Sequence, residues 1–435
     1  MSDLLMIGAS GIKAYGRALQ TTGDNVANAN TAGYVRRDIS LSEAGPSGDS
    51  VFYRNQVNPG GVTVDGVTRA ADQWLTDDAR AAGTDAAETG AKVPWLEAAE
   101  RTFADGGSGV GPGMTAVFNR IDELTANPTD STRRQAVLDA LGDVTSSFQR
   151  TATGLDNASA GVASQAQTTV DNLNTNITAL QKVNDGLRRA RAGSTNQADL
   201  LDARDQLLDK INAALPTTVG YEATGAATLT LNGQPVLAAS TSTTLTISLT
   251  GGTLTVAGAA PGGGALAGLA SAARQLSDNR SALDTLAVNY RDAMNAVQAG
   301  GRDLNGQPGQ PLLSGTGATD LTVALTSPDG IAAADATGPA GNALQFANLR
   351  GSTGGEARWA ALVGQQSQSV ASAQAQDAAA TSRRDGANAA RDAKSAVDLD
   401  TEAANLVRYQ QAYDASARVL QVARDTMQSI LSALG

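Results

Sequence analysis

Residues 397–435 read VDLDTEAANLVRYQQAYDASARVLQVARDTMQSILSALG, and they carry the clearest repeat in the chain. A seven-residue apolar repeat is typical of a helix that packs in a coiled coil. At about 1.5 Å per residue, the helix would be roughly 54 Å long. The positions seven apart are Leu399, Leu406, Tyr413, Leu420, Met427 and Leu434, with Tyr409, Ala423 and Ile430 at companion positions. This end of the chain is therefore predicted to be buried against a partner.

The beginning of the chain carries a similar repeat. Leu5, Ile12, Leu19 and Val26 stand seven apart within a helix-like stretch. Four heptads alone make a marginal helix, so this segment needs a partner as well. Three arrangements remain open: an antiparallel pair within one chain, a coiled coil between copies, and the shared core of a polymer. Periodicity alone does not separate these three, and our hypothesis is that the two repeats form the assembly interface.

The first repeat ends in NVANANTAGYVRRD, residues 25–38. Asn and Gly tolerate left-handed backbone conformations, so this stretch predicts a helix stop. Thr31 and Tyr34 are expected to make contacts, and Arg36 and Arg37 are expected to be available to acidic neighbouring subunits. The motif residues are Asn28, Thr31, Gly33 and Tyr34.

Between the two ends of the chain, helix-like and strand-like stretches of sequence alternate. Leu141, Phe148, Leu155 and Val162 fall seven apart and predict a long helix, although Gly154 and Gly161 lower helix propensity. YVRRDISLSE, VFYRNQV and GVTVDGVTR look like short strands, and TLTLNGQPVLAAS and TLTISLTGGTLTVAG alternate as half-buried antiparallel strands do. Asn232-Gly233 and Gly251-Gly252 predict hairpin turns.

These patterns predict a mainly α fold with inserted β structure. The expected molecule is elongated, with terminal coiled-coil helices, a long helical bundle and a small antiparallel β domain. The predicted segments are 1–33 (N-terminal assembly helix), 34–70 (extended), 71–215 (helical rod domain), 216–262 (β domain, first part), 263–299 (helix), 300–350 (β domain, second part) and 351–435 (C-terminal helical assembly segment).

Composition excludes several classes of function. Of 435 residues only 3% are aromatic, which suits slender helical packing better than a large globular core. The formal net charge of −11 argues against binding to nucleic acid or to anionic membrane surfaces. No apolar run approaches the roughly 18 residues of a membrane span. The N-terminus lacks a basic region followed by an apolar core, so no Sec-type signal peptide is expected.

The chain is not expected to be an enzyme or to bind a metal or cofactor. It contains no cysteine and no histidine, which removes thiolate nucleophiles, Ser-His triads and the commonest zinc ligands. GGSGVGPG, residues 106–113, lacks the lysine of a phosphate loop, and residues 302–311 lack the spacing of a calcium loop. LLDARDQLLDKI, residues 200–211, is interpreted as an amphipathic helix. Asp398, Asp400 and Glu402 are interpreted as acids at a helix start, where the dipole favours them.

Three stretches resemble one known family. Asn-x-x-Thr-x-Gly-Tyr at residues 28–34 and Asn-Leu-x-x-Tyr-Gln-Gln-x-Tyr at residues 405–413 are similar to the signatures of bacterial flagellar rod, hook and hook-associated proteins. QADLLDARDQLLDKINAAL, with the helical block before it, is similar to the hook-associated members that join hook to filament. Hook and rod proteins carry the same ends without this helical middle.

The resemblance implies a structural subunit that polymerises through its terminal helices. It would form a ring at the extracellular hook–filament junction after export, without a cleaved signal peptide, through the flagellar type III apparatus. The implied partners are other copies of the chain, the hook protein, a second hook-associated junction protein and an export chaperone. The chaperone would bind the C-terminal helix at Leu420, Met427 and Leu431.

Three alternatives are kept open. One is a hook or distal rod subunit of the same family, which would lack helices between residues 85 and 215. A second is an enzyme carried on the axial frame, which would need an acidic pair in a cleft. The third is a cytoplasmic signalling coiled coil, which the β segments and the Asn-rich turn disfavour.

Overall fold

The structure is a computed structural model that describes residues 2–44, 60–104, 106–239 and 241–434, with only the backbone of Ser2, Ala433 and Leu434. The chain forms two compact units, each built from separate stretches of sequence. Unit 1 comprises residues 1–83, 173–244 and 382–435, and unit 2 comprises residues 84–172 and 245–381. Most described residues are helical, and the strands form small antiparallel sheets, as predicted. The predicted strand VFYRNQV, residues 51–57, lies outside the described residues.

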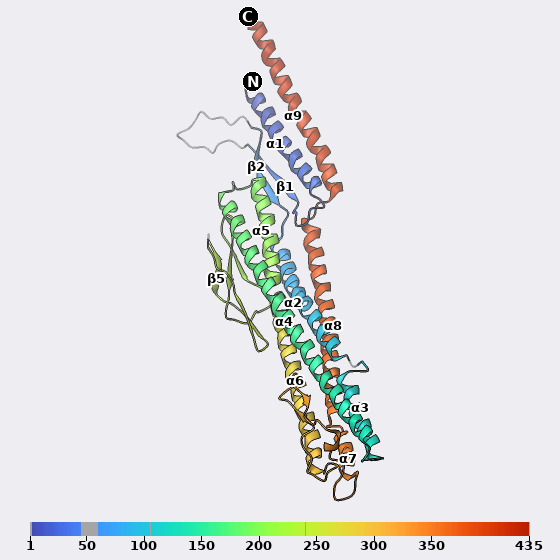
Figure 1. Cartoon of the computed structure of the whole chain (residues 1–435). Helices are drawn as coiled ribbons and strands as arrows, with labels where there is room; N and C mark the ends of the chain where they lie inside the picture. The colour runs from blue at the N-terminus through green and yellow to red at the C-terminus, as the bar shows by residue number, and fades with distance from the viewer. Residues whose placement is uncertain (1, 45–59, 105, 240, 435) are drawn as a thin grey trace. The chain divides into compact units, whose positions relative to one another are not determined.

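The two ends of the chain form a helix pair in unit 1. Helix α1 (Ser2–Ala27) lies beside α9 (Leu399–Leu434), and the helices run antiparallel, so both chain ends lie at the same end of the pair (Figure 1). The hairpin of β1 (Arg37–Glu43) and β2 (Val62–Arg69) packs on α1. Its register runs from Arg37 opposite Arg69 to Glu43 opposite Val62, with an irregularity between Ser40 and Leu41.

The rest of unit 1 contains α5 (Thr195–Ala214) and a four-stranded sheet. The Ser194 hydroxyl accepts a hydrogen bond from the Gln197 amide and so caps α5. The sheet has the order β3 (Thr218–Tyr221), β4 (Ala227–Leu231), β5 (Gln234–Ala238) and β6 (Thr241–Ser242). Asn232 and Gly233 have φ of 51° and 79°, which is the two-residue turn that the sequence predicts between β4 and β5.

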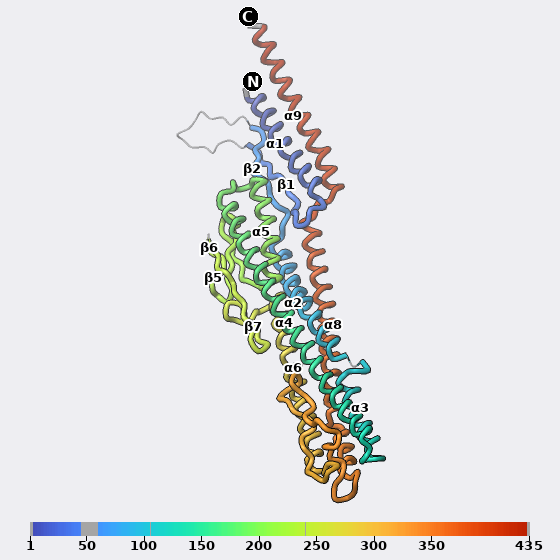
Figure 2. The backbone as a smooth tube through the Cα atoms, in the orientation of Figure 1, coloured from blue at the N-terminus to red at the C-terminus, as the bar shows by residue number. Residues whose placement is uncertain are grey.

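Three long helices contribute residues to both units: α2 (Gln73–Phe103), α4 (Ser131–Arg189) and α8 (Gly355–Ser395). The tube in Figure 2 shows α4 as one continuous helix, although it contains Gly154 and Gly161. In unit 2, a Cβ at Gly154 would lie 2.5 Å from the Thr102 side chain, and one at Gly161 would clash with the Trp95 ring. The two glycines therefore let α2 pack closely against α4. The predicted repeat of α4, Leu141 to Val162, is fully buried.

Unit 2 is completed by α3 (Val110–Thr125), α6 (Gly264–Gly300) and α7 (Gly341–Gln345), with short 3-10 turns at Pro328–Gly330 and Phe346–Leu349. Strands β7 (Ile247–Thr250) and β8 (Thr253–Val256) form a hairpin whose turn, as predicted, is Gly251-Gly252. Strands β9 (Leu313–Ser314) and β10 (Thr322–Val323) form a second small pair.

The expectation of one β domain in two parts is corrected. Strands from residues 216–262 and from residues 300–350 form separate sheets. In residues 300–350, side-chain amides of α6 satisfy several backbone groups: Asn295 accepts from the amides of Leu312 and Leu313, and Gln298 donates to the Gly330 carbonyl. Because these amides satisfy the buried backbone, the segment packs on α6 as irregular chain.

The predicted helical middle is confirmed, since residues 71–215 contain α2, α3, α4 and α5. Among the helices described, none is long and apolar enough to cross a membrane.

Candidate assembly interface

Small residues let α1 and α9 approach closely. Gly8 and Gly11 are buried, and a Cβ at Gly8 would lie 3.1 Å from Leu420, while one at Gly11 would lie 2.9 Å from the Ser416 Cβ. The rings of Tyr15 and Tyr409 stack with their centroids 6.5 Å apart. These contacts fix the register of an antiparallel pair within one chain.

The predicted stripe of α1 lies beside this close contact rather than within it. Leu5, Ile12 and Leu19 are half-buried, and Val26 is exposed. The fully buried positions of α1 are small or polar residues: Gly8, Gly11, Ala14, Ala18, Thr21, Thr22 and Asn25. A search for large apolar residues misses such a face, because close helix packing selects small ones.

The predicted stripe of α9 divides into two groups. Leu406, Tyr409 and Leu420 are half-buried and Ala423 is buried in unit 1. The exposed group is Leu399, Tyr413, Met427 and Ile430, and the side chain of Leu434 lies outside the described residues. Leu431, expected in the chaperone site and not in the repeat, is exposed as well. Because α9 has 36 residues and α1 has 26, and Gly8 lies against Leu420, the last turns of α9 extend past the start of α1. The apolar side chains of Met427, Ile430 and Leu431 in these turns are exposed.

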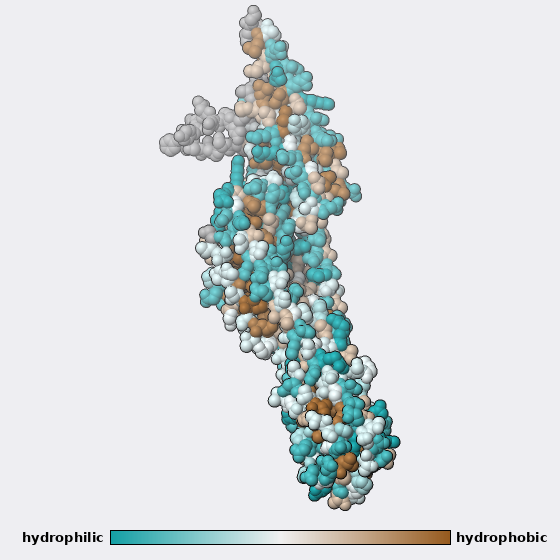
Figure 3. All heavy atoms as spheres, viewed as in Figure 1, coloured by the Kyte–Doolittle hydropathy of each residue, from teal (hydrophilic) through white to brown (hydrophobic). Residues whose placement is uncertain are grey.

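Further apolar side chains are exposed that the seven-residue repeat does not include. They are Leu4 and Met6 on α1, and Val407, Val419 and Val422 on α9. Figure 3 shows apolar side chains at the surface of this part of unit 1, between hydrophilic ones. For Val419 and Val422, the signal in the sequence is the density of apolar residues in 419–423, which places apolar side chains on more than one face of the helix.

The Asn-rich motif ends α1, as predicted. The Thr31 amide donates to the Asn28 carbonyl at 2.9 Å, and the Tyr34 amide donates to the Thr31 carbonyl at 3.1 Å. Gly33 has φ of +77°, and a Cβ there would also clash with Gln206 of α5. Gly33 is therefore required by its backbone conformation, because the exposed side chain of Gln206 is flexible enough to move away.

Asn25 holds this loop closed, although the sequence reasoning did not select it. It is 1% exposed, and its Oδ1 accepts hydrogen bonds from the Tyr34 hydroxyl at 2.9 Å and the Arg37 amide at 3.0 Å. Its Nδ2 donates to the Arg37 carbonyl at 2.8 Å. Burial raises the pKa of Tyr34 to about 12, so this hydroxyl remains a donor. The only signal in the sequence is that Asn25 belongs to the Asn-rich motif.

Arg37 corrects a prediction, because it is not available to other subunits. Its side chain is 3% exposed and forms ion pairs with Asp199 at 2.6 Å and Asp202 at 3.0 Å of α5. The guanidinium also lies over the Tyr34 ring, 4.7 Å from its centroid. Arg36 pairs with Asp38 at 3.3 Å.

One acidic face of α5 binds arginines from several elements of unit 1. Asp202 accepts from Arg69 of β2 at 2.7 Å as well as from Arg37 of β1. Asp209 accepts from Arg80 of α2 at 3.0 Å and from Arg391 of α8 at 3.3 Å. Burial raises the pKa of Asp202 and Asp209, and the arginine charges oppose that shift. Interpreting residues 200–211 as an amphipathic helix is correct, but it does not reveal this arginine-binding face.

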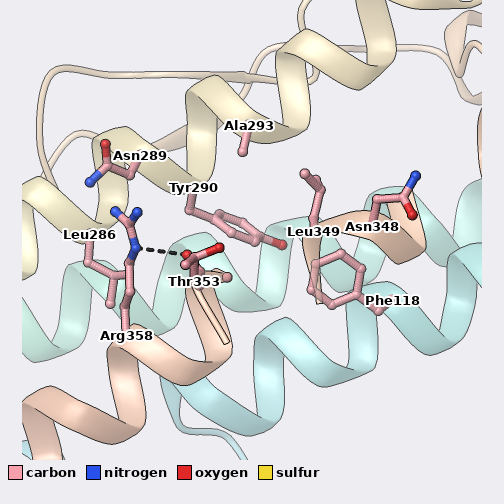
Figure 4. A pocket seen from close by; sticks show the side chains of 11 residues that line it. Phe118, Leu286, Asn289, Tyr290, Ala293, Asn348, Leu349, Thr353 and Arg358 are labelled. Atoms are coloured by element: carbon pink, nitrogen blue, oxygen red, sulfur yellow. Dashed lines mark hydrogen bonds between the residues drawn. The ribbon is translucent and has the colours of Figure 1, made fainter. Parts of the chain in front are cut away.

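Two hollows were considered as alternative sites. One of about 590 Å³ in unit 1 lies between the motif loop and α5, and charges of both signs line it, including Asp205, Lys210 and Arg391. In unit 2, a hollow of about 220 Å³ contains the Tyr290 side chain, whose buried hydroxyl has no hydrogen-bond partner (Figure 4). Burial raises the pKa of Tyr290, so the hydroxyl stays protonated. Arg358 at the rim donates to the Thr353 carbonyl at 2.9 Å, and no carboxylate is among the described residues that line this hollow.

The geometry and the two chain ends together define the class. Residues 5–34 match the family of flagella basal body rod proteins, and residues 392–433 match the C-terminal region of flagellar basal body rod FlgEFG proteins. Both matches fall on α1 with its loop and on α9, which are the elements of the terminal pair. The ends are therefore those of flagellar axial proteins.

A third match identifies the family. Residues 96–313, half of the chain, match the helical domain of the flagellar hook-associated protein FlgK. The chain belongs to the FlgK family of hook-associated proteins, and the resemblance stated from its sequence is confirmed.

Relatives called flagellar hook-associated protein 1 are similar to the chain over most of its length. The relative from Salmonella typhimurium is 25% identical over 355 residues, which is 75% of this chain and 63% of the relative. That from Escherichia coli K12 is 26% identical over 334 residues, 72% of this chain and 60% of the relative. The chain thus spans less than two thirds of the length of these relatives. The Bacillus subtilis relative is 25% identical over 491 residues, covering 98% of this chain and 96% of the relative.

A solved structure of the flagellar hook junction protein FlgK from Burkholderia pseudomallei is also similar. It is 23% identical with a TM-score of 0.48, over 54% of this chain and 46% of that chain.

Proposed function

We propose that this chain is a structural subunit of the bacterial flagellum, which polymerises through α1 and α9 and joins hook to filament. One observation carries the proposal: α9 is packed against α1 on one side and exposes apolar side chains, such as Val422, Ile430 and Leu431, on others. Exposed apolar residues gathered on one element mark an interaction site. The family and the names of its relatives support the flagellar setting.

The proposed interface consists of both predicted repeats. Burying a large apolar side chain contributes about 1.5–3 kcal/mol, so the exposed members could together supply a stable contact between copies. The proposed residues are Leu5, Ile12, Leu19, Val26, Leu399, Leu406, Tyr409, Tyr413, Leu420, Met427, Ile430 and Leu434. Leu4, Met6, Val407, Val419 and Val422 join them because the structure exposes them.

The proposed partners are other copies in a ring, the hook protein, a second junction protein and an export chaperone. For the chaperone we propose Leu420, Met427 and Leu431. Leu431 is 66% exposed, whereas Leu420 lies against Gly8 of α1. A chaperone that covers all three residues would therefore displace α1 from this part of α9.

The proposed role is structural rather than enzymatic. It takes place outside the cell, at the hook–filament junction, after export by the flagellar type III route. No binding of nucleic acid, membrane or cofactor is part of the proposal. The net charge of −11 supports the absence of a nucleic-acid partner.

The decisive experiment compares two variants of the last turns of α9. Met427→Asp with Ile430→Asp places charges in the exposed apolar group beyond α1, and Gln428→Asp places one on a neighbouring exposed polar position. We expect the double variant to keep its helix content and to be absent from purified flagella, while Gln428→Asp is incorporated. Normal incorporation of the double variant would refute the proposed interface.

A hook or distal rod subunit is the second candidate, supported by the matches at both ends. Deleting the gene separates the two. Loss of a junction protein should leave hooks assembled while filament protein is released unpolymerised, whereas loss of a hook or rod subunit should abolish hooks. The FlgK-type helical domain favours the first outcome.

A further inference from the structure

Glu402 lies buried in the first turn of α9, facing α1. It is 1% exposed, and Tyr409, whose ring stacks on Tyr15 of α1, follows seven residues later on the same face of α9. Thr22 and Asn25 of α1 are the hydrogen-bonding side chains beside its carboxyl group. The sequence indicates only an acid near a helix start, which would ordinarily lie in solvent.

The carboxyl group of Glu402 is incompletely satisfied. Its Oε1 is buried and has no hydrogen-bond partner. Arg36, the cation that faces it, is paired with Asp38 at 3.3 Å, and Asp38 adds a negative charge. Arg36 also faces Asp398, the acid four residues earlier. An ionised carboxylate in such a place is disfavoured relative to its neutral form.

Burial accordingly raises the pKa of Glu402. The hydrogen bonding of Asn25 and Thr22 and the charge of Arg36 oppose the shift, and Asp38 reinforces it. These are the facing groups from α1, from the segment before β1 and from β1 itself.

Asn25 connects this carboxyl group to the motif loop. The same amide that holds Tyr34 and Arg37 lies beside Glu402. The position of the start of α9 is therefore coupled to closure of the loop after α1.

We propose that Glu402 is a protonation-sensitive positioning residue, and that α9 docks on α1 and its loop more tightly when Glu402 carries a proton. Any effect of this protonation on assembly rests on the proposed function, because the proposed interface uses the same helix pair. Docking itself is a property of one chain, so the two proposals can fail separately.

The sign of the effect follows from linkage. The docked state binds the proton more tightly than the undocked state, because the carboxyl pKa is raised on docking. Docking strengthens as the pH falls through the docked-state pKa, and this gain is lost at higher pH.

The test measures docking in the full chain. The protein has no cysteine, so spin labels can be placed at the exposed positions Lys13 of α1 and Ala415 of α9, each changed to Cys. Pulsed-dipolar distance distributions between pH 8 and pH 5 give the ratio of docked to undocked molecules. We compare Glu402→Gln, which imitates the neutral acid, Glu402→Ala as a second variant, and Asp414→Asn, which removes an exposed carboxylate of α9.

In the parent chain and in Asp414→Asn, we expect the ratio of docked to undocked molecules to rise about threefold or more on acidification. In Glu402→Gln the ratio should already be high at pH 8 and should change little down to pH 5. In Glu402→Ala the ratio should also change little with pH, whatever its value at pH 8. The same pH dependence in the Gln and Ala variants as in the parent would overturn the proposal. So would a parent chain without pH dependence, or one undocked at every pH. The docking measurement and the incorporation experiment described above are independent, so assembly is tested by incorporation alone.

Discussion

At the scale of single residues, two buried polar side chains hold the loop after α1 and the β1–β2 hairpin in place. Asn25 makes three hydrogen bonds that span from residue 25 to residues 34 and 37. Asp202 joins two arginines from opposite strands of the β1–β2 hairpin. Both are buried, so removing either leaves polar groups without water or partner.

Asn25→Ala should destabilise unit 1 by about 2–3 kcal/mol, because the Arg37 amide and carbonyl lose their partner in a buried place. Hydrogen exchange of residues 28–37, together with denaturant unfolding, measures the effect. Asn30→Ala is the matched control, since Asn30 is exposed in the same loop, and it should change stability little. Equal effects of the two substitutions would contradict the role given to Asn25.

Asp202→Asn should destabilise unit 1 by about 2–3 kcal/mol, because Arg37 and Arg69 each lose a buried charged partner and keep only the more exposed carboxylates of Asp199 and Asp205. Asp199→Asn removes a carboxylate from the same arginine, yet its side chain is 60% exposed against 8% for Asp202. An exposed pair contributes about 1 kcal/mol or less, so this control should be mild. Chemical denaturation at neutral pH measures both, and a reversed order would show that the acidic face does not hold the hairpin.

At the scale of elements, α1 is a helix whose glycines are part of its packing. Gly8 and Gly11 lie against α9, whereas Gly23 has no atom within 4 Å of its added Cβ. Substituting a glycine of α1 should therefore have different effects at different positions of the helix. Close approach requires glycine at the first two positions, and only helix propensity matters at the third.

Gly11→Leu should separate α1 from α9, since even a Cβ would lie 2.9 Å from the Ser416 Cβ. Gly23→Ala should instead stabilise the helix by about 0.5–1 kcal/mol. Thermal unfolding of α1, followed by hydrogen exchange, distinguishes the two. Stabilisation by Gly11→Leu would mean that the helices are not in close contact there.

Comparison of elements shows which features can be predicted from the sequence. The buried stripe of α4 and the turns at Asn232-Gly233 and Gly251-Gly252 follow from local pattern, because periodicity and turn chemistry act over a few residues. The packed face of α1 cannot be predicted in this way, because its residues are small or polar and do not form a repeat of large apolar residues. The Arg37–Asp199 pair joins residues 162 apart, and no local pattern indicates it. The helix stop is predictable for the same local reason, while the function of Asn25 within it is not.

At the scale of the whole molecule, the two units draw on different parts of the chain. Both ends belong to unit 1, and unit 2 is built from internal residues 84–172 and 245–381. Unit 2 has its own buried anchor in Arg134, which donates to the carbonyls of Pro128 at 2.7 Å and Ile331 at 2.7 Å. Burial lowers the pKa of Arg134, and the nearby carboxylates of Asp329 and Asp303 oppose that shift.

Removal of residues 1–27 and 399–435 should therefore abolish incorporation into flagella and leave unit 2 folded. None of the deleted residues belongs to unit 2, so the hydrogen-exchange protection of its helices α3 and α6 should be unchanged. The converse variant, Arg134→Met, leaves the carbonyls of Pro128 and Ile331 without their hydrogen-bond donor. It should lower hydrogen-exchange protection in unit 2 by about 3 kcal/mol. It should leave the exchange of α1 and α9 as in the parent chain. If the terminal deletion also removed protection from α6, the terminal helices would be part of the folding core, and they could not serve as an element that assembly adds to an already folded subunit.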